Sequence, residues 1–166
     1  MTDFFNKTDL SRNDAEKIIS ETLNNCDDGE LYLENSKSES IVLDDDKIKS
    51  STYSSDLGYG LRAVTGEVVA YSHSNEISRN SLKQSADNLS STLKSRKGVY
   101  NHEIPKTNEK FYKDINPIEE KSLQSKLELL KEVNNYTRAK GGIVQQVTAS
   151  FSGEHKSIEI IRSGGE

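Results

Sequence analysis

The sequence contains few of the residues that most often mark a catalytic or metal-binding site. Its 166 residues include a single cysteine, Cys26, which cannot form an internal disulfide and so fits a reducing compartment. Three histidines are present, at positions 73, 102 and 155. His102 has no second histidine at helical spacing, so no zinc-binding helix is expected around it.

Long apolar and long basic segments are absent as well. No apolar run approaches the ~20 residues that span a bilayer. Residues 1–10 lack the basic and apolar regions of a signal peptide. The 22 basic and 27 acidic residues are interspersed, so no basic stripe is available to neutralise nucleic-acid phosphates. We therefore expect a cytoplasmic protein that binds neither a membrane nor a nucleic acid.

The composition that remains predicts one ordinary domain. The chain is 32% hydrophobic and 30% charged, which favours a modest core and a strongly solvated surface. Its length suits a single core. Residues 30–74 have the pattern of an antiparallel meander of four or five strands, with turn signals at 44–46 and 65–67. Together with the helices below, this predicts a single α+β domain over residues 1–166, with one face of the sheet packed and one solvated.

The first helix is predicted over residues 12–26, beginning after Ser11. The cysteine lies on its apolar face, and no histidine or basic cluster stands beside it in sequence, so we interpret it as a small core residue rather than a reactive thiol. The apolar face of this helix comprises Ala15, Ile18, Ile19, Thr22, Leu23 and Cys26.

Two further helices are predicted over residues 78–96 and 117–139. Ser78 is a favourable N-cap for the former. Asn116 and Pro117 have the cap and first-turn preferences that begin the latter. The predicted inner line of the last helix comprises Leu123, Leu127, Leu130, Val133 and Asn134.

The C-terminal part is predicted to form a β-hairpin over residues 143–162, with a turn at Gly153 and Glu154. Because the chain ends in turn residues, we expect a fragment or a truncated gene product. On this interpretation residues 155–166 would form an unprotected sheet edge.

Three ordered blocks of the sequence resemble the N-terminal domain of the TldD/PmbA metalloprotease family, with the TldD-like branch favoured. They are LYLENSKSES, LGYGLRAVTGE and VQQVTASFSG. The most distinctive piece is the pattern G-x-G-x-R-A-x-x-G. It falls on Gly58, Gly60, Arg62, Ala63 and Gly66.

The resemblance implies that the family's chemistry lies elsewhere. It places the zinc on an H-E-x-x-x-H helix in a larger C-terminal domain, which this chain lacks. The one His-Glu pair here, His102-Glu103, is followed by Pro105, which would interrupt a ligand-bearing helix. We therefore expect no catalytic, metal or cofactor residue in this chain and no activity when it is isolated. Zinc is implied for the full-length family member.

The resemblance also implies partners. The domain would cover its catalytic domain, line the substrate chamber around an extended peptide, and contact a related subunit in a homo- or heterodimer. The implied activity is peptide or protein breakdown or processing in the cytoplasm. Two alternatives stay open: a stand-alone module that binds peptides by β-strand addition, or a fragment without an independent role.

Four residues of the distinctive pattern are assigned a structural or partner-contact role: Gly58, Gly60, Arg62 and Gly66. A dinucleotide loop would need glycine where Ala63 stands and a helix beginning there. We expect Arg62 to pair with a carboxylate such as Glu67, or else to reach a partner domain. The acidic run 44–46 lacks the alternating ligands and closing glutamate of a calcium loop, so a solvated hairpin tip is expected there.

Overall fold

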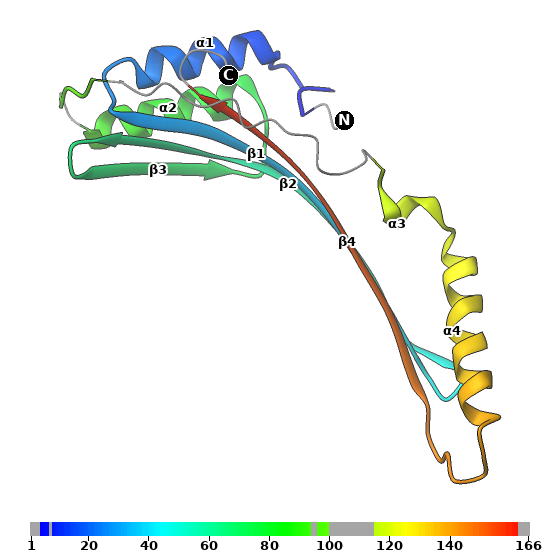
Figure 1. Cartoon of the computed structure of the whole chain (residues 1–166). Coiled ribbons are helices and arrows are strands. Elements are labelled where there is room, and N and C mark those ends of the chain that lie inside the picture. Colours follow the sequence, from blue (N-terminus) through cyan, green and yellow to red (C-terminus); the bar gives the residue numbers. More distant parts are fainter. Residues whose placement is uncertain (1–3, 7, 94–95, 100–114, 163–166) are drawn as a thin grey trace. The chain divides into compact units, whose positions relative to one another are not determined.

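The computed structural model describes residues 4–6, 8–93, 96–99 and 115–162. Four strands form one antiparallel sheet in the order β3-β2-β1-β4, and helices accompany them, so the predicted α+β class is confirmed (Figure 1). The elements in chain order are α1 (Arg12–Leu23), β1 (Asp28–Asp44), β2 (Lys47–Thr65), β3 (Val68–Ser74), α2 (Arg79–Leu93), α3 (Pro117–Glu120), α4 (Leu123–Arg138) and β4 (Thr148–Arg162).

The chain divides into two compact units. The first contains residues 1–35, 56–112 and 157–166, and the second contains 36–55 and 113–156. β1, β2 and β4 therefore each contribute residues to both units. The meander itself has three strands, where four or five were expected, because β1 and β2 continue for 17 and 19 residues without a break.

In the first unit α1 and α2 pack on the same side of the strands (Figure 1). The Ser11 hydroxyl accepts a hydrogen bond from the Asp14 amide at 3.1 Å, as expected of an N-cap. Ser78 accepts one from the Ser81 amide at 3.2 Å. The shared core includes Ala15, Ile19, Leu23, Cys26, Leu31, Leu33, Leu61, Ala63, Ala70, Leu82, Leu89 and Ile161. The predicted apolar face of the first helix thus enters this core, with Ile18 and Thr22 half-buried. The helix ends at Leu23, earlier than predicted, and Cys26 follows it as a buried residue.

The second unit is built on the tip of the β1–β2 hairpin. α4 lies alongside this tip (Figure 1), and its Leu130 packs with Ile41 and Leu43 of β1 and Ala149 of β4. Alternate residues of β1 therefore enter this core, as the period of two requires.

The helix predicted over 117–139 is interrupted. Lys121 is extended, with φ −116° and ψ 138°, and Ser122 then caps a new helix by accepting from the Ser125 amide at 3.2 Å. The inner line also differs from the predicted one, because Leu123 and Val133 are exposed whereas Lys126 is buried.

The C-terminal hairpin predicted over 143–162 is a single strand. β4 runs through Gly153 and Glu154 without a turn and lies beside β1. Gly153 does not use its freedom to adopt a positive φ; a Cβ there would lie 3.5 Å from the Ile118 Cγ1 atom. Ile143, the first residue of the predicted hairpin, lies outside β4 and is 91% exposed. The glycine is therefore part of the extended backbone and not a turn.

The acidic hairpin tip is a two-residue turn with Asp45 and Asp46 at φ 45° and 64°, the type I′ arrangement. Its location was predicted correctly, but its carboxylates are bonded to the protein. Asp45 accepts from Arg138 and from the Val147 amide, and Asp46 accepts from Asn134 at 2.5 Å. The tip therefore fixes the end of α4 and the approach to β4, two segments far away in sequence.

A buried ion pair lies in the second unit. Lys126 is 5% exposed at its side chain, and its ammonium group donates to Glu39 at 2.5 Å and to the Ile118 carbonyl at 2.6 Å. Since both charged groups are removed from water, each depends on the other for compensation.

Removing the ammonium group should destabilise the second unit strongly. We expect Lys126→Met to lower the free energy of unfolding by about 3–5 kcal/mol, because it leaves a buried carboxylate without a cation. Adding Glu39→Met should restore most of the loss, since an apolar pair of similar volume is often neutral or stabilising. Urea denaturation followed by circular dichroism measures both. Lys37→Met, in the exposed pair with Glu119, is the control and should have little effect. A double variant as unstable as the single one would contradict this account.

Candidate functional site: the open face of the sheet

The side of the first unit's strands that faces away from α1 and α2 is the candidate site, and we call it the open face. Because side chains alternate along a strand, the residues between the core positions lie on it. Antiparallel pairing places Gly60 opposite His73, Arg62 opposite Tyr71 and Val64 opposite Val69. The open face comprises Asp28, Glu30 and Tyr32 of β1, Gly60, Arg62 and Val64 of β2, Val69, Tyr71 and His73 of β3, and Ile158, Ile160 and Arg162 of β4.

Arg62 is held by carboxylates of the neighbouring strand β1. Its Nη2 atom lies 2.5 Å from Asp28 Oδ2, and its Nε lies 3.4 Å from Glu30 Oε1. Arg162 of β4 lies 3.4 Å from the other oxygen of Glu30. The expected pairing with a carboxylate is confirmed, but the partners are Asp28 and Glu30 and not the suggested Glu67. Glu67 is in the turn after β2, whereas β1 brings two carboxylates beside the guanidinium group. The two cations and two anions balance one another.

The titration behaviour of this cluster follows from its contacts. Partial burial raises the pKa of Asp28, but the hydrogen bond and charge of Arg62 outweigh it and bring that pKa below its ordinary value. Burial lowers the pKa of Arg62, while its bond to Asp28 raises it, and the second effect prevails. Next on β1, a 2.5 Å hydrogen bond to Glu34 and some burial raise the pKa of Tyr32 to about 12.

The two glycines of β2 are close to other parts of the chain. A Cβ at Gly58 would lie 2.8 Å from the carbonyl oxygen of Ser74, where the chain leaves β3. A Cβ at Gly60 would lie 2.5 Å from the Tyr71 hydroxyl, because that ring crosses over the glycine. The ring also stacks on His73, with centroids 5.8 Å apart. Both glycines thus allow a close approach within the β2–β3 pair.

Gly66 has φ +59° in the two-residue turn between β2 and β3. Its amide donates to Asp27 at 2.6 Å, and the Val99 amide donates to the other oxygen of that carboxylate at 2.9 Å. These amides lower the pKa of Asp27. Sequence reasoning missed this residue, because an aspartate after a helix indicates only a helix end, and its two partners are distant in sequence.

Of the remaining candidates, Cys26 lies among the described residues. Cys26 is buried, and burial raises the pKa of its thiol. His102 and Glu103 lie outside the described residues. Within the described ranges, no group of three or more His, Cys, Asp and Glu side chains could hold a metal ion. None of the described helices is long and apolar enough to cross a bilayer.

The margins of the open face are apolar and exposed. Val69 and Tyr71 on β3, and Ile158 and Ile160 on β4, project large apolar side chains into solvent. Between them lie the ion pairs of Arg62, which leave little uncompensated charge. Apolar margins around an internally neutralised centre suit contact with another protein surface.

Comparisons with known proteins show the family of this chain. Residues 29–93 match the family described as PmbA/TldA metallopeptidase domain 1. The chain is 34% identical over 140 residues to a metalloprotease TldD homolog of Buchnera aphidicola subsp. Acyrthosiphon pisum, and 32% identical over 147 residues to one of Haemophilus influenzae. The alignments cover 84% and 85% of this chain but only 29% and 30% of those relatives.

A solved structure shares the fold. TldE from Thermococcus kodakarensis superposes with a TM-score of 0.57 over 90% of this chain and 35% of that one, at 16% identity. The chain carries the N-terminal domain of the TldD/PmbA metalloprotease family. It spans less than a third of the length of the two TldD homologs.

The two glycines should respond differently to alanine. Gly58→Ala places a methyl group against the Ser74 backbone, which must move, so we expect a loss of about 1–3 kcal/mol in the free energy of unfolding. Gly60→Ala meets the far end of an exposed tyrosine that can rotate away, so its loss should stay below about 1 kcal/mol. Urea denaturation of both variants tests the order. A larger loss for Gly60→Ala would contradict the assigned contacts.

Removing Arg62 should change the acid dependence of stability. The depressed pKa of Asp28 stabilises the folded state above its unfolded pKa of about 3.9, and this contribution is lost as pH falls through the lower folded value. We expect Arg62→Met to cost about 1–3 kcal/mol at pH 7 and clearly less at pH 2.5, measured by urea denaturation. Lys49→Met, in an exposed pair with Asp44, serves as control. A loss of the same size at both pH values would count against the pairing.

Proposed function

We propose that this chain acts as the non-catalytic N-terminal domain of a TldD-like zinc-dependent peptidase that breaks down or processes peptides in the cytoplasm. In this role it helps to enclose the substrate chamber and contributes to contacts with a related subunit, in a homo- or heterodimer. The observation that carries the proposal is the match to TldD homologs, which are more than three times longer than the aligned segment.

The open face supports a docking role. Covering its exposed apolar side chains is favourable by about 25 cal/mol per Å² of apolar surface removed from water. These side chains are Val69, Tyr71, Ile158 and Ile160. Its charged centre is already paired, so covering it buries no charge without a partner. We assign this face to contact with the catalytic domain of the full-length protein.

Zinc and the hydrolytic chemistry are assigned to that catalytic domain, because the residues of this chain do not fit a zinc site. The sequence has no H-E-x-x-x-H, and its one His-Glu pair is followed by Pro105. Zinc in a peptidase polarises the scissile carbonyl and activates a water molecule. This chain supplies no identified ligand for it.

The alternative of a peptide-binding module is favoured by one observation. β4 has a strand neighbour on only one side in the described sheet, and an edge strand can accept an extended peptide. This alternative does not exclude the first, since a domain that lines a peptidase chamber can also bind peptide.

A chimera tests the proposal. We expect the Haemophilus influenzae homolog, with its matching segment replaced by this chain, to retain the zinc content and peptidase activity of its parent on an unstructured peptide. Tyr71→Asp combined with Ile160→Asp in the chimera should lower activity by about tenfold or more, because two apolar contacts of the open face are lost. The isolated chain should show neither activity nor bound zinc.

Matched exposed residues outside the open face provide the control. Ile48→Asp with Tyr53→Asp changes two exposed side chains of β2 that belong to the second unit, and this variant should remain active. Loss of activity in both variants would contradict the assignment of the open face. About one zinc per isolated chain, lost on mutating His102, would overturn the non-catalytic role.

A further inference from the structure

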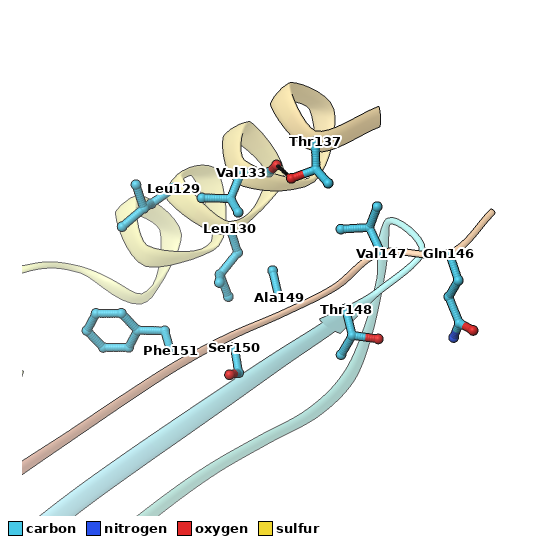
Figure 2. A pocket seen from close by; sticks show the side chains of 10 residues that line it. All are labelled: Leu129, Leu130, Val133, Thr137, Gln146, Val147, Thr148, Ala149, Ser150 and Phe151. Atoms are coloured by element: carbon cyan, nitrogen blue, oxygen red, sulfur yellow. Dashed lines mark hydrogen bonds between the residues drawn. The ribbon is translucent and has the colours of Figure 1, made fainter. Parts of the chain in front are cut away.

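A groove in the second unit runs between α4 and the beginning of β4. It has a volume of about 420 Å³. Leu129, Leu130, Val133 and Thr137 form the wall on α4, and residues 146–151 form the opposite wall (Figure 2). We call it the α4–β4 groove. All of its lining residues belong to the second unit.

The lining shows that the groove follows the backbone of β4. Figure 2 shows Val147, Ala149 and Phe151 pointing toward α4, whereas Thr148 and Ser150 point the other way. A groove on one face of a strand would be lined by alternate residues only. Here six consecutive residues line it, so it reaches the edge of the strand, where the backbone itself is accessible.

The outer backbone groups of this segment face no other strand within the described ranges. Among the strands that the structure describes, β4 is last in the sheet order and has β1 as its one neighbour. The Asp45 amide donates to the Val147 carbonyl at 3.0 Å. Because antiparallel ladders alternate, the amides and carbonyls of Thr148, Ser150 and Ser152 then point away from β1.

The edge of β4 beside the groove lacks the charged residues and proline that commonly prevent strand addition. Charged residues, proline and bulges protect most natural sheet edges. Residues 141–153 contain no charged residue and no proline, in a chain that is 30% charged. Beyond them the charged residues Glu154, Lys156 and Glu159 follow along β4. The unprotected part of the edge therefore coincides with the part that lines the groove.

The helical wall is suited to apolar side chains. Leu129 and Val133 of α4 are about half exposed, although large apolar residues of a packed helix are usually covered. An extended chain placed on the β4 edge would direct every second side chain toward this wall. Uncharged walls offer nothing to compensate a charged side chain there.

We propose that the α4–β4 groove binds an extended, uncharged peptide segment with apolar residues at alternate positions, as an added strand on β4. The backbone of the peptide pairs with the outward groups of Thr148, Ser150 and Ser152, and its apolar side chains contact Leu129 and Val133. This site is non-catalytic. Peptide binding there does not depend on whether the open face docks on a peptidase domain.

Fluorescence anisotropy with the full chain tests the proposal. The probe is a blocked octapeptide of alternating threonine and valine, labelled with fluorescein through a short spacer. We expect saturable binding with a Kd on the order of 100 µM or tighter. The same peptide with its alternate amides N-methylated keeps its side chains but loses the donors needed for pairing, and it should bind about tenfold more weakly or not at all.

Two substitutions on opposite walls locate the site. Leu129→Lys places a charge on the helical wall, and Ser150→Pro removes an outward amide while leaving the ladder to β1 intact. Each should weaken binding of the unmethylated probe by about tenfold or more. Leu123→Lys is the matched control, since Leu123 lies on the same helix with nearly the same exposure, 53% against 50% for Leu129, but does not line the groove. It should bind the probe normally.

Circular dichroism of each variant shows whether the fold is retained, and Leu129→Lys carries the test if Ser150→Pro does not fold. Absence of probe binding, or equal binding of the methylated peptide, would overturn the proposal. So would a chain that dimerises through this edge, with dimerisation abolished by Leu129→Lys, because the occupant would then be a second copy. These outcomes are independent of the activity of the chimera, which depends on the open face.

Discussion

The alternation of side chains along β1 is the constraint on which both units depend. Leu31 and Leu33 enter the core formed with α1 and α2, and Ile41 and Leu43 enter the core formed with α4 and β4. All four lie at odd positions of one 17-residue strand. A shift by one residue would move the apolar side chains of both cores into solvent. The polar residues between them, such as Glu30, are thereby placed on the opposite side of the strand.

Local signals in the sequence predicted the local structure well. Ser11, Ser78 and Asn116 mark the beginnings of helices because a cap acts through its own neighbours. The turns at 44–46 and 65–67 were likewise predictable from residue type. The errors involve long-range pairing. Glycine is common in turns, yet Gly153 is extended because β4 pairs with β1 through this position. Lys126 was not in the predicted inner line of its helix, yet it is buried because it pairs with Glu39 of β1.

The candidate site could be predicted in part. The pattern around Gly58, Gly60 and Arg62 pointed to β2, because a glycine within a strand usually marks a bulge or a close approach of another part of the chain. The reasons themselves lie on other strands, in Tyr71, Ser74 and the carboxylates of β1. The groove beside β4 could not be predicted, because its two walls come from segments whose adjacency is a property of the fold. Its uncharged stretch was visible in the sequence, but an uncharged stretch alone indicates burial as readily as binding.

The bonds at the hairpin tip also set the order in which the chain can fold. Gln146 and Thr148 donate to Asp44 across 102 and 104 residues of sequence, and Asn134 reaches Asp46 across 88. The β2–β3 hairpin and α2 need only neighbouring residues, so they can form early. During synthesis, Ile41 and Leu43 must remain uncovered until α4 and β4 have left the ribosome. A nascent chain stalled before residue 130 therefore presents a first unit that still lacks the β4 segment with Ile161. Its β1–β2 hairpin has an apolar face that α4 and β4 do not yet cover, and chaperones bind surfaces of this kind.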